Sequence, residues 1–220
     1  MNIKDSINIL NGQEMLKYFE KHNLTENGIY IPFNEAMCVG EAASDIFSVE
    51  FVKQRCRAHD VSLEKYHEIT LLPLKSLFEN RFSNIILWFD DDMFCQINLL
   101  TILAYLSQIN YTGKTVLNLV NREFKVVDSI ELDLEGYSNL YEDIIIYKNM
   151  PQDIKLPSIQ NGIKLYLEYL KEDNEITSYI RQHFDLQNDI LVQELLKEFQ
   201  QYGLGDTQYV QLIEKCRNHI

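Results

Sequence analysis

Three consecutive aspartates, Asp90–Asp92, are the residues whose type and spacing most readily suggest chemistry in this chain. They directly follow Asn84–Phe89, an almost entirely apolar segment with the pattern of a buried strand. Open α/β sheets place their ligands outside the carboxyl ends of such strands. Asp90 and Asp92 could therefore hold Mg²⁺, because hard cations prefer oxygen ligands. The alternative is that the aspartates only cap the free N–H groups of a following helix.

Two further loops carry polar residues at the same predicted edge. Asn11 and Gly12 follow the predicted strand Ser6–Leu10, where a phosphate-binding turn at a helix start would lie. A plain strand-to-helix turn explains them as well, because a dinucleotide fingerprint needs two more glycines at fixed spacing. Glu35 follows the predicted strand Ile29–Phe33 and either faces the same crevice or is a solvated loop carboxylate.

Arg55 and Arg57 form the densest basic group of the chain. Arg55 could bind an anion through two parallel hydrogen bonds. The alternative is a solvated helix face whose arginines pair with nearby acidic residues, namely Glu41, Glu50 or Asp60. With Gln96, which lies in the first turn of the predicted helix after the aspartates, the candidate ligand-binding residues are Asn11, Gly12, Glu35, Arg55, Asp90, Asp91, Asp92 and Gln96.

Other familiar kinds of site are not indicated by the sequence. The five histidines lack metal-binding spacing, and no Gly-x-Ser-x-Gly motif occurs. The four cysteines are scattered without a Cys-x-x-Cys pair, so we expect free buried thiols, with Cys95 as part of the core: Cys38, Cys56, Cys95 and Cys216. No catalytic residue follows from these patterns, and whether the protein is an enzyme stays open.

The charge balance restricts the partners. Twenty basic and 33 acidic residues give a net charge of −13, which repels phosphate backbones and anionic membranes. The polar start of the chain lacks a signal-peptide core, and no apolar stretch has the length of a membrane span. We therefore expect a soluble cytoplasmic protein without a nucleic-acid or membrane partner. The ligand, any protein partner and the oligomeric state stay open.

The first half of the chain predicts an α/β layer. Eight glycines and four prolines are too few turn formers for a sandwich or barrel of many short strands. Met93–Gln108 is apolar on nearly all sides, which indicates a buried helix. It follows a strand that we expect to be covered on both faces, and another strand follows it, so the unit should be a parallel β-α-β crossover. The predicted strands are Ser6–Leu10, Ile29–Phe33, Asn84–Phe89 and Thr115–Val120.

The second half predicts helices. A stripe of apolar residues from Tyr137 to Ile145 favours a helix over a strand at 144–147, and Ser158 is expected to cap another helix. Further helices are expected at 176–184, 190–199 and 206–217. The predicted fold class is α/β: a mainly parallel Rossmann-like sheet with helices on both faces, followed by an α-helical C-terminal region. The predicted domains are an α/β domain at 1–128 and a helical region at 129–220 packed on it.

Four segments resemble a known family. They are Ile9–Gly12, Asn34–Gly40, Trp88–Leu100 and Gly203–Gln208, and the tryptophan-to-leucine segment is the specific one. Together they resemble the bacterial domain-of-unknown-function family 1835. Family members often carry an acidic residue where this chain has Gln13. The resemblance implies a fold and a bacterial origin, and it implies no activity.

Two functional hypotheses follow. The first is a small anionic or nucleotide-like ligand at the C-terminal edge of the sheet, with or without Mg²⁺ and catalysis; it depends on the loops at Asn11, Glu35 and Asp90–Asp92. The second is a non-enzymatic regulatory or protein-interaction module, which depends on the acidic composition and the missing catalytic motifs.

Overall fold

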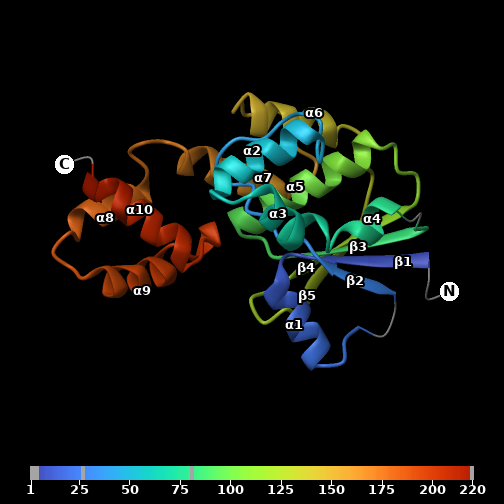
Figure 1. The fold of residues 1–220 in the computed structure, drawn as a ribbon, viewed down its shortest axis with the longest axis horizontal. Helices are drawn as coiled ribbons and strands as arrows, with labels where there is room; N and C mark the ends of the chain where they lie inside the picture. Colours follow the sequence, from blue (N-terminus) through green and yellow to red (C-terminus); the bar gives the residue numbers. More distant parts are fainter. Residues whose placement is uncertain (1–4, 26–27, 80–81, 219–220) are drawn as a thin grey trace.

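A five-stranded sheet forms the centre of the molecule. The computed structural model describes residues 5–25, 28–79 and 82–218. The strand order is β2-β1-β3-β4-β5; the first four strands are parallel, and β5 runs antiparallel to β4 (Figure 1). The strands are β1 (Ser6–Leu10), β2 (Ile29–Pro32), β3 (Asn84–Phe89), β4 (Lys114–Val120) and β5 (Val126–Leu132). The predicted α/β class and the four predicted strands are confirmed.

The strand order reverses between β1 and β3, and this reversal positions the candidate site. The chain leaves β1 into α1 (Gln13–Lys21) on one face of the sheet, and leaves β3 into α5 (Met93–Gln108) on the other (Figure 1). The two connections therefore diverge at the carboxyl ends of neighbouring strands. In doubly wound sheets, ligands bind in the crevice at such a point.

Helix α5 is the centre of the core, as its composition predicts. Twelve of its 16 residues are buried. It packs on β3 with one side, while α6 (Tyr137–Tyr141) and α7 (Pro157–Tyr169) cover the other. A helix enclosed in this way needs apolar residues all round.

The two faces of the sheet are covered unequally. Ile85, Leu87 and Phe89 of β3 are buried toward α5, whereas Asn84, Ile86 and Trp88 on the opposite face are half-buried. Among the helices of the described residues, α1 is the one that Figure 1 shows on that second face. The prediction that this strand is covered on both faces is confirmed: Trp88 packs with Met15 and Phe19 of α1, although this single short helix leaves the second face less completely covered than the first.

An irregular helical segment connects β2 to β3. It contains α2 (Val49–His59), α3 (Leu63–Tyr66), the π-helical turn η2 (His67–Leu71) and α4 (Lys75–Glu79). The π-helical turn directly continues α3, and Pro73 separates it from α4, as the sequence indicates. Single π-helical turns are uncommon and are frequent at functional sites.

The second half of the chain is helical. The expected helix at 144–147 is present as η3 (Glu142–Ile146), which continues α6. The remaining elements α8 (Glu175–Gln182), α9 (Asn188–Glu198), η4 (Gln200–Tyr202) and α10 (Asp206–Asn218) form a C-terminal lobe beside the sheet (Figure 1). Within the described ranges, each helix is too short or too polar to cross a lipid bilayer.

Two details differ from the expectations. Strand β5 is an additional strand, and it runs across residue 128, where the α/β domain was expected to end. Ser158 does not cap α7, because the helix begins one residue earlier at Pro157 with Leu156 at the N-cap position. Proline suits the first helical position because its missing N–H needs no partner there.

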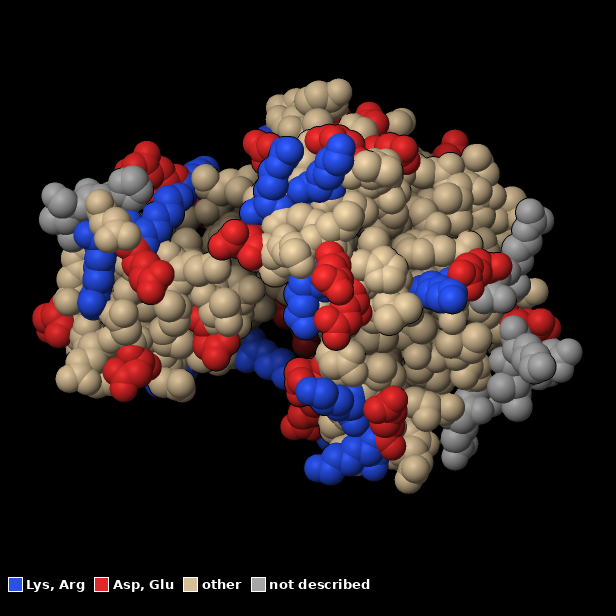
Figure 2. Space-filling view, in the orientation of Figure 1, with Lys and Arg blue, Asp and Glu red and all other residues tan. Residues whose placement is uncertain are grey.

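A hollow separates part of the C-terminal lobe from the α/β body (Figure 2). Between the lobe and the body, a cavity of about 380 Å³ is lined by Cys38–Gly40 from the body and by Cys216 from α10. The lobe contacts the body at Gly203, where an added Cβ would lie 2.2 Å from Asp92 Oδ1. Glycine at 203 therefore allows the lobe to approach the start of α5.

Candidate functional site

A cavity of about 670 Å³, here named the edge cavity, lies at the carboxyl ends of β1 and β2. Most of its surface is apolar, and a few polar groups converge on it, as is usual in small-molecule sites. The residues that line it are Gly12, Gln13, Phe33–Ala36, His59, Val61, Tyr66, Glu68–Thr70, Pro73 and Phe94.

Glu35 is the charged centre of this region, and its side chain is 0% exposed. Its Oε1 accepts hydrogen bonds from the Ala36 N–H at 2.8 Å, Arg55 Nη2 at 2.9 Å and His59 Nε2 at 2.5 Å. Its Oε2 accepts from the Tyr66 hydroxyl at 2.6 Å. Burial would raise the pKa of Glu35, but the His59 hydrogen bond and the Arg55 charge outweigh it and lower the pKa to about 2. The carboxylate is therefore an anchor that is charged at neutral pH.

Arg55 neutralises this carboxylate from inside the protein. Its side chain is fully buried, and it also donates to the carbonyl oxygens of Ala36, Val39 and Glu41 at 2.9, 2.6 and 3.0 Å. The prediction of a solvated arginine paired with an acidic side chain of its surroundings is wrong. The anion that Arg55 binds is Glu35, and the arginine fixes the loop that follows β2 instead of lining the edge cavity.

His59 and Tyr66 are residues of the site that sequence reasoning missed. Both line the edge cavity and both donate to Glu35. Their rings are nearly parallel, with centroids 6.4 Å apart. The available signal was the four-residue spacing of Arg55 and His59, which places both on one face of a helix.

The two residues of the turn after β1, Asn11 and Gly12, lie in different surroundings. Gly12 is the N-cap residue of α1 with φ of 92°, no side chain caps the helix there, and the residue lines the edge cavity. Asn11 faces α5 instead: its Nδ2 donates to Cys95 Sγ at 2.8 Å, and its Oδ1 accepts from Asn98 Nδ2 at 3.0 Å. The uncapped start of α1 is therefore the part of this turn that a ligand in the cavity can reach.

Asn98 ties the loops after β1 and β2 to α5. Besides Asn11, its Nδ2 donates to the Glu35 carbonyl oxygen at 2.7 Å, and its Oδ1 accepts from the Met37 N–H at 3.0 Å. Asn98 is fully buried in α5, two residues after the buried Gln96. Its amide was a signal that sequence reasoning did not use, because buried amides need partners.

The three aspartates have separate structural tasks. Asp92 caps α5: its Oδ1 accepts from the Cys95 N–H at 2.7 Å, and its Oδ2 accepts from the Cys95 thiol at 3.4 Å. Asp90 accepts from the N–H of Asp91, whose own side chain is exposed. Burial, together with the charge of Asp92, raises the pKa of Asp90 to about 6.

These positions add no support for a magnesium site. None of the three aspartates lines the edge cavity. In the described part of the chain, no three His, Cys, Asp or Glu side chains are placed to hold a metal ion together. Mg²⁺ binding by Asp90 and Asp92 stays a prediction.

Gln96 is buried beneath this turn. Its Nε2 donates to the Asp90 carbonyl oxygen at 2.6 Å. Gly162 of α7 packs so closely on it that an added Cβ would lie 2.4 Å from Gln96 Cβ. Gln96 therefore connects the β3 turn to α7 and does not line the edge cavity.

Several of the predicted site residues belong to one hydrogen-bond network, but they do not all line the same cavity. Through Cys95 and Asn98, helix α5 links Asn11, Glu35 and Asp92. Of the eight candidate residues, Gly12 and Glu35 line the edge cavity. The hypothesis that the loops at Asn11, Glu35 and Asp90–Asp92 border one cavity is wrong for this cavity, because Asn11 and Asp92 bond to residues of α5, Asp90 bonds to the Asp91 N–H, and Asp91 is exposed.

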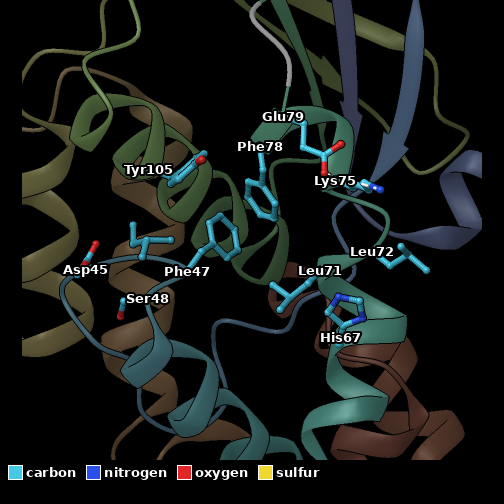
Figure 3. Close-up of a pocket in the computed structure, with 11 residues that line it drawn as sticks. Asp45, Phe47, Ser48, His67, Leu71, Leu72, Lys75, Phe78, Glu79 and Tyr105 are labelled. Atoms are coloured by element: carbon cyan, nitrogen blue, oxygen red, sulfur yellow. Dashed lines mark ion pairs between the residues drawn. The ribbon is translucent and has the colours of Figure 1, made fainter.

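A second cavity, here named the aromatic cavity, has a volume of about 660 Å³ (Figure 3). Phe47, Phe78 and Tyr105 form one wall, with rings packed edge to face and centroids 4.9–5.9 Å apart. Leu71 and His67 lie across from them (Figure 3). The turn η2 separates the two cavities, because residues 68–70 line the edge cavity while His67 and Leu71 line the aromatic one.

Comparison of the chain with protein-family models, with curated proteins and with solved structures finds no match in any of the three. The geometry of the edge cavity is therefore the basis on which a function can be proposed.

Proposed function

We propose that this protein binds a small amphipathic anion in the edge cavity, a class that includes mononucleotides and short carboxylates. The observation that carries the proposal is the uncapped start of α1 within an otherwise apolar cavity at the carboxyl edge of the sheet. Cavities of several hundred Å³ with apolar walls and few polar groups are the usual form of such sites.

The start of α1 supplies the site for the anionic group. The first N–H groups of a helix have no partner within it, and the helix dipole places partial positive charge there. Gly12 carries no side chain that would compete for these donors, and no Cβ contact would crowd it. Glu35 does not oppose an anion strongly, because Arg55 neutralises it at 2.9 Å.

Apolar side chains supply the site for the rest of the ligand. Phe33, Val61, Ile69, Pro73 and Phe94 line the same cavity. Burying a planar or aliphatic group against them gains roughly 25 cal/mol per Å² of apolar surface removed from water. The combination favours a molecule with one charged end and one apolar body.

The test compares each anion with its neutral analogue by titration calorimetry. AMP is paired with adenosine, and octanoate with octanol. A helix N-terminus stabilises an anion by about 1–2 kcal/mol in partly buried geometry, so the charged member should bind roughly 5- to 30-fold more tightly. Equal affinities within both pairs, or no binding of any of the four, would contradict the proposal.

Two tryptophan variants locate the binding. Ile69 lines the edge cavity and is 42% exposed, so Ile69→Trp should fill the cavity without disturbing the core. Leu72→Trp is the matched control, because Leu72 is 51% exposed on the same segment but lines the aromatic cavity. Ile69→Trp should abolish binding of the anion, and Leu72→Trp should leave it unchanged.

The aromatic cavity favours the alternative of a protein-interaction module. Phe78 is 39% exposed at this cavity, which the exposed Leu72 also lines. Exposed apolar side chains around a depression are typical of protein contact surfaces. If a second copy of the chain is the partner, sedimentation velocity should show concentration-dependent association that Phe78→Asp removes; a monomer at all concentrations would contradict this alternative.

A further inference from the structure

The edge cavity also holds a histidine that is arranged as a base. Resting on the proposed function, we propose that His59 is the general base of a hydrolytic site that cleaves carboxylic esters with an apolar acyl chain. Three observations carry this proposal: the fixed tautomer of His59, its place at the cavity wall, and the start of α1 in the same cavity.

The hydrogen bond to Glu35 fixes the tautomer. An ionised carboxylate can only accept, so the proton of a neutral His59 lies on Nε2, 2.5 Å from Glu35 Oε1. Arg55 Nη2 lies 3.0 Å from the same nitrogen and likewise donates to Glu35. The lone pair is therefore on Nδ1. In the described part of the chain, Nδ1 has no hydrogen-bond partner from the protein.

The carboxylate that supports His59 is buried, whereas the His59 ring reaches the cavity wall. The Glu35 side chain is 0% exposed and accepts four hydrogen bonds, whereas the His59 side chain is 25% exposed and lines the edge cavity. A buried carboxylate that orients an imidazole from behind leaves the other ring nitrogen free for proton transfer. Glu35 is thus a positioning residue, and His59 is the residue that meets the substrate.

The start of α1 can stabilise the charge that develops in the reaction. Gly12 and Gln13 line the same cavity as His59, and the nine-residue helix α1 has no side-chain cap. Backbone N–H groups at a helix start stabilise the oxyanion that forms when an ester carbonyl is attacked. The same groups would hold the carboxylate product, which is an amphipathic anion of the proposed class.

The nucleophile in this scheme is water. Among the described residues that line the cavity, Tyr66 and Thr70 carry hydroxyl groups, and both hydroxyls already donate hydrogen bonds within the protein. Tyr66 donates to Glu35, and Thr70 donates to the Asn34 carbonyl oxygen, so neither is available as the nucleophile. Water forms a bond to the acyl carbon while its proton moves to His59 Nδ1. The acyl carbon–oxygen bond then breaks, and the leaving alkoxide takes that proton. The products are a carboxylic acid, ionised at neutral pH, and an alcohol.

The experiment measures hydrolysis of p-nitrophenyl butyrate by the full chain and by His59→Gln. Glutamine can still donate a hydrogen bond to Glu35, but it cannot take up a proton. Loss of a general base typically lowers the rate 10²- to 10⁴-fold, so kcat should fall at least about 100-fold. His67→Gln is the matched control, because His67 lies on the neighbouring turn and lines the aromatic cavity.

The outcomes separate this proposal from the previous one. A parent rate equal to that of His59→Gln, or an equal loss in His67→Gln, overturns the catalytic role. If calorimetry then still shows butyrate binding that Ile69→Trp removes, the binding site stands without catalysis. If butyrate does not bind the parent or His59→Gln, the proposed function fails as well.

Folding is checked independently. Near-ultraviolet circular dichroism and the thermal midpoint of His59→Gln should match those of the parent. If His59→Gln does not fold, Ile69→Trp decides the matter, because it retains His59 but fills the cavity. Full hydrolysis by Ile69→Trp would overturn the proposal.

Discussion

The ends of β2 and β3 carry carboxylates in opposite electrostatic situations. Glu35, after β2, is fully buried beside Arg55 and His59, and its pKa is lowered to about 2. Asp90, after β3, is partly buried next to Asp92, and its pKa is raised to about 6. Both residues follow a strand at the same edge of the same sheet. The comparison teaches that the neighbours of a carboxylate, and not its place at the edge, decide whether it is an anchor or a proton-binding group.

The largest expected effect is on stability when Glu35 is removed. Glu35→Leu leaves Arg55 buried without its anion and removes the acceptor of His59 and Tyr66. Breaking a buried ion pair in this way costs about 3–5 kcal/mol, which urea unfolding measures. The exposed Asp91 is the control, and Asp91→Leu should change the free energy of unfolding by less than about 0.5 kcal/mol. If Glu35→Leu and Asp91→Leu lowered the free energy of unfolding by similar amounts, the buried ion pair of Glu35 would not be the cause of the loss.

A smaller effect is expected at the cap of α5. Asp92→Ala removes the acceptor of the Cys95 N–H and should destabilise the protein by about 0.5–2 kcal/mol. Asp92→Asn keeps an oxygen that can accept this bond and should recover most of the loss. If the asparagine variant is as unstable as the alanine variant, the charge of Asp92 has a further partner that capping does not explain.

The third effect, and the sharpest for the comparison, is on the dependence of stability on pH. Because the pKa of folded Glu35 is about 2 against an ordinary value of 4.5, its stabilisation is complete above pH 4.5 and is lost as the pH falls toward 2. For Asp90 the sign is opposite. Its pKa of about 6 against 3.8 means that the folded state holds the proton longer, so stability falls as the pH rises from about 4 to 6.

The variant Asp90→Asn isolates the second contribution. It should flatten the decline in stability between pH 4 and 6 and raise the thermal midpoint at pH 7 relative to the parent. Thermal unfolding in buffers across this range measures both. An unchanged slope in Asp90→Asn would show that Asp90 titrates near its ordinary value.

The strands and α5 could be predicted because local patterns specify them. Ser6–Leu10 and Met93–Gln108 have the lengths and apolar content of buried elements, and the structure places them at these bounds. Strand β5 was missed because most of its side chains are exposed, so Val126–Leu132 lacks the apolar pattern of a core strand. An edge strand that is held mainly by backbone hydrogen bonds to its neighbour has no apolar pattern from which it could be predicted.

The candidate site was predicted in part, and the limit has a physical cause. The cap formed by Asp92 follows from its place between a strand and a helix, which is local information. The side-chain partners of Glu35 are 20, 24 and 31 residues away along the chain. A local sequence pattern therefore cannot predict that Glu35 forms a buried ion pair. Charged residues are mostly exposed, so the sequence left a solvated position open as an alternative for both Glu35 and Arg55.

The π-helical turn η2 gives the two cavities a common partition. Residues 68–70 face one cavity while His67 and Leu71 face the other, so a shift of η2 toward one side enlarges the opposite space. A molecule that displaced η2 from one cavity would change the volume of the other, whereas a side chain that fills its own cavity without moving the turn leaves the neighbouring cavity as it is. By thermodynamic reciprocity, a coupling through η2 would be equally strong in both directions.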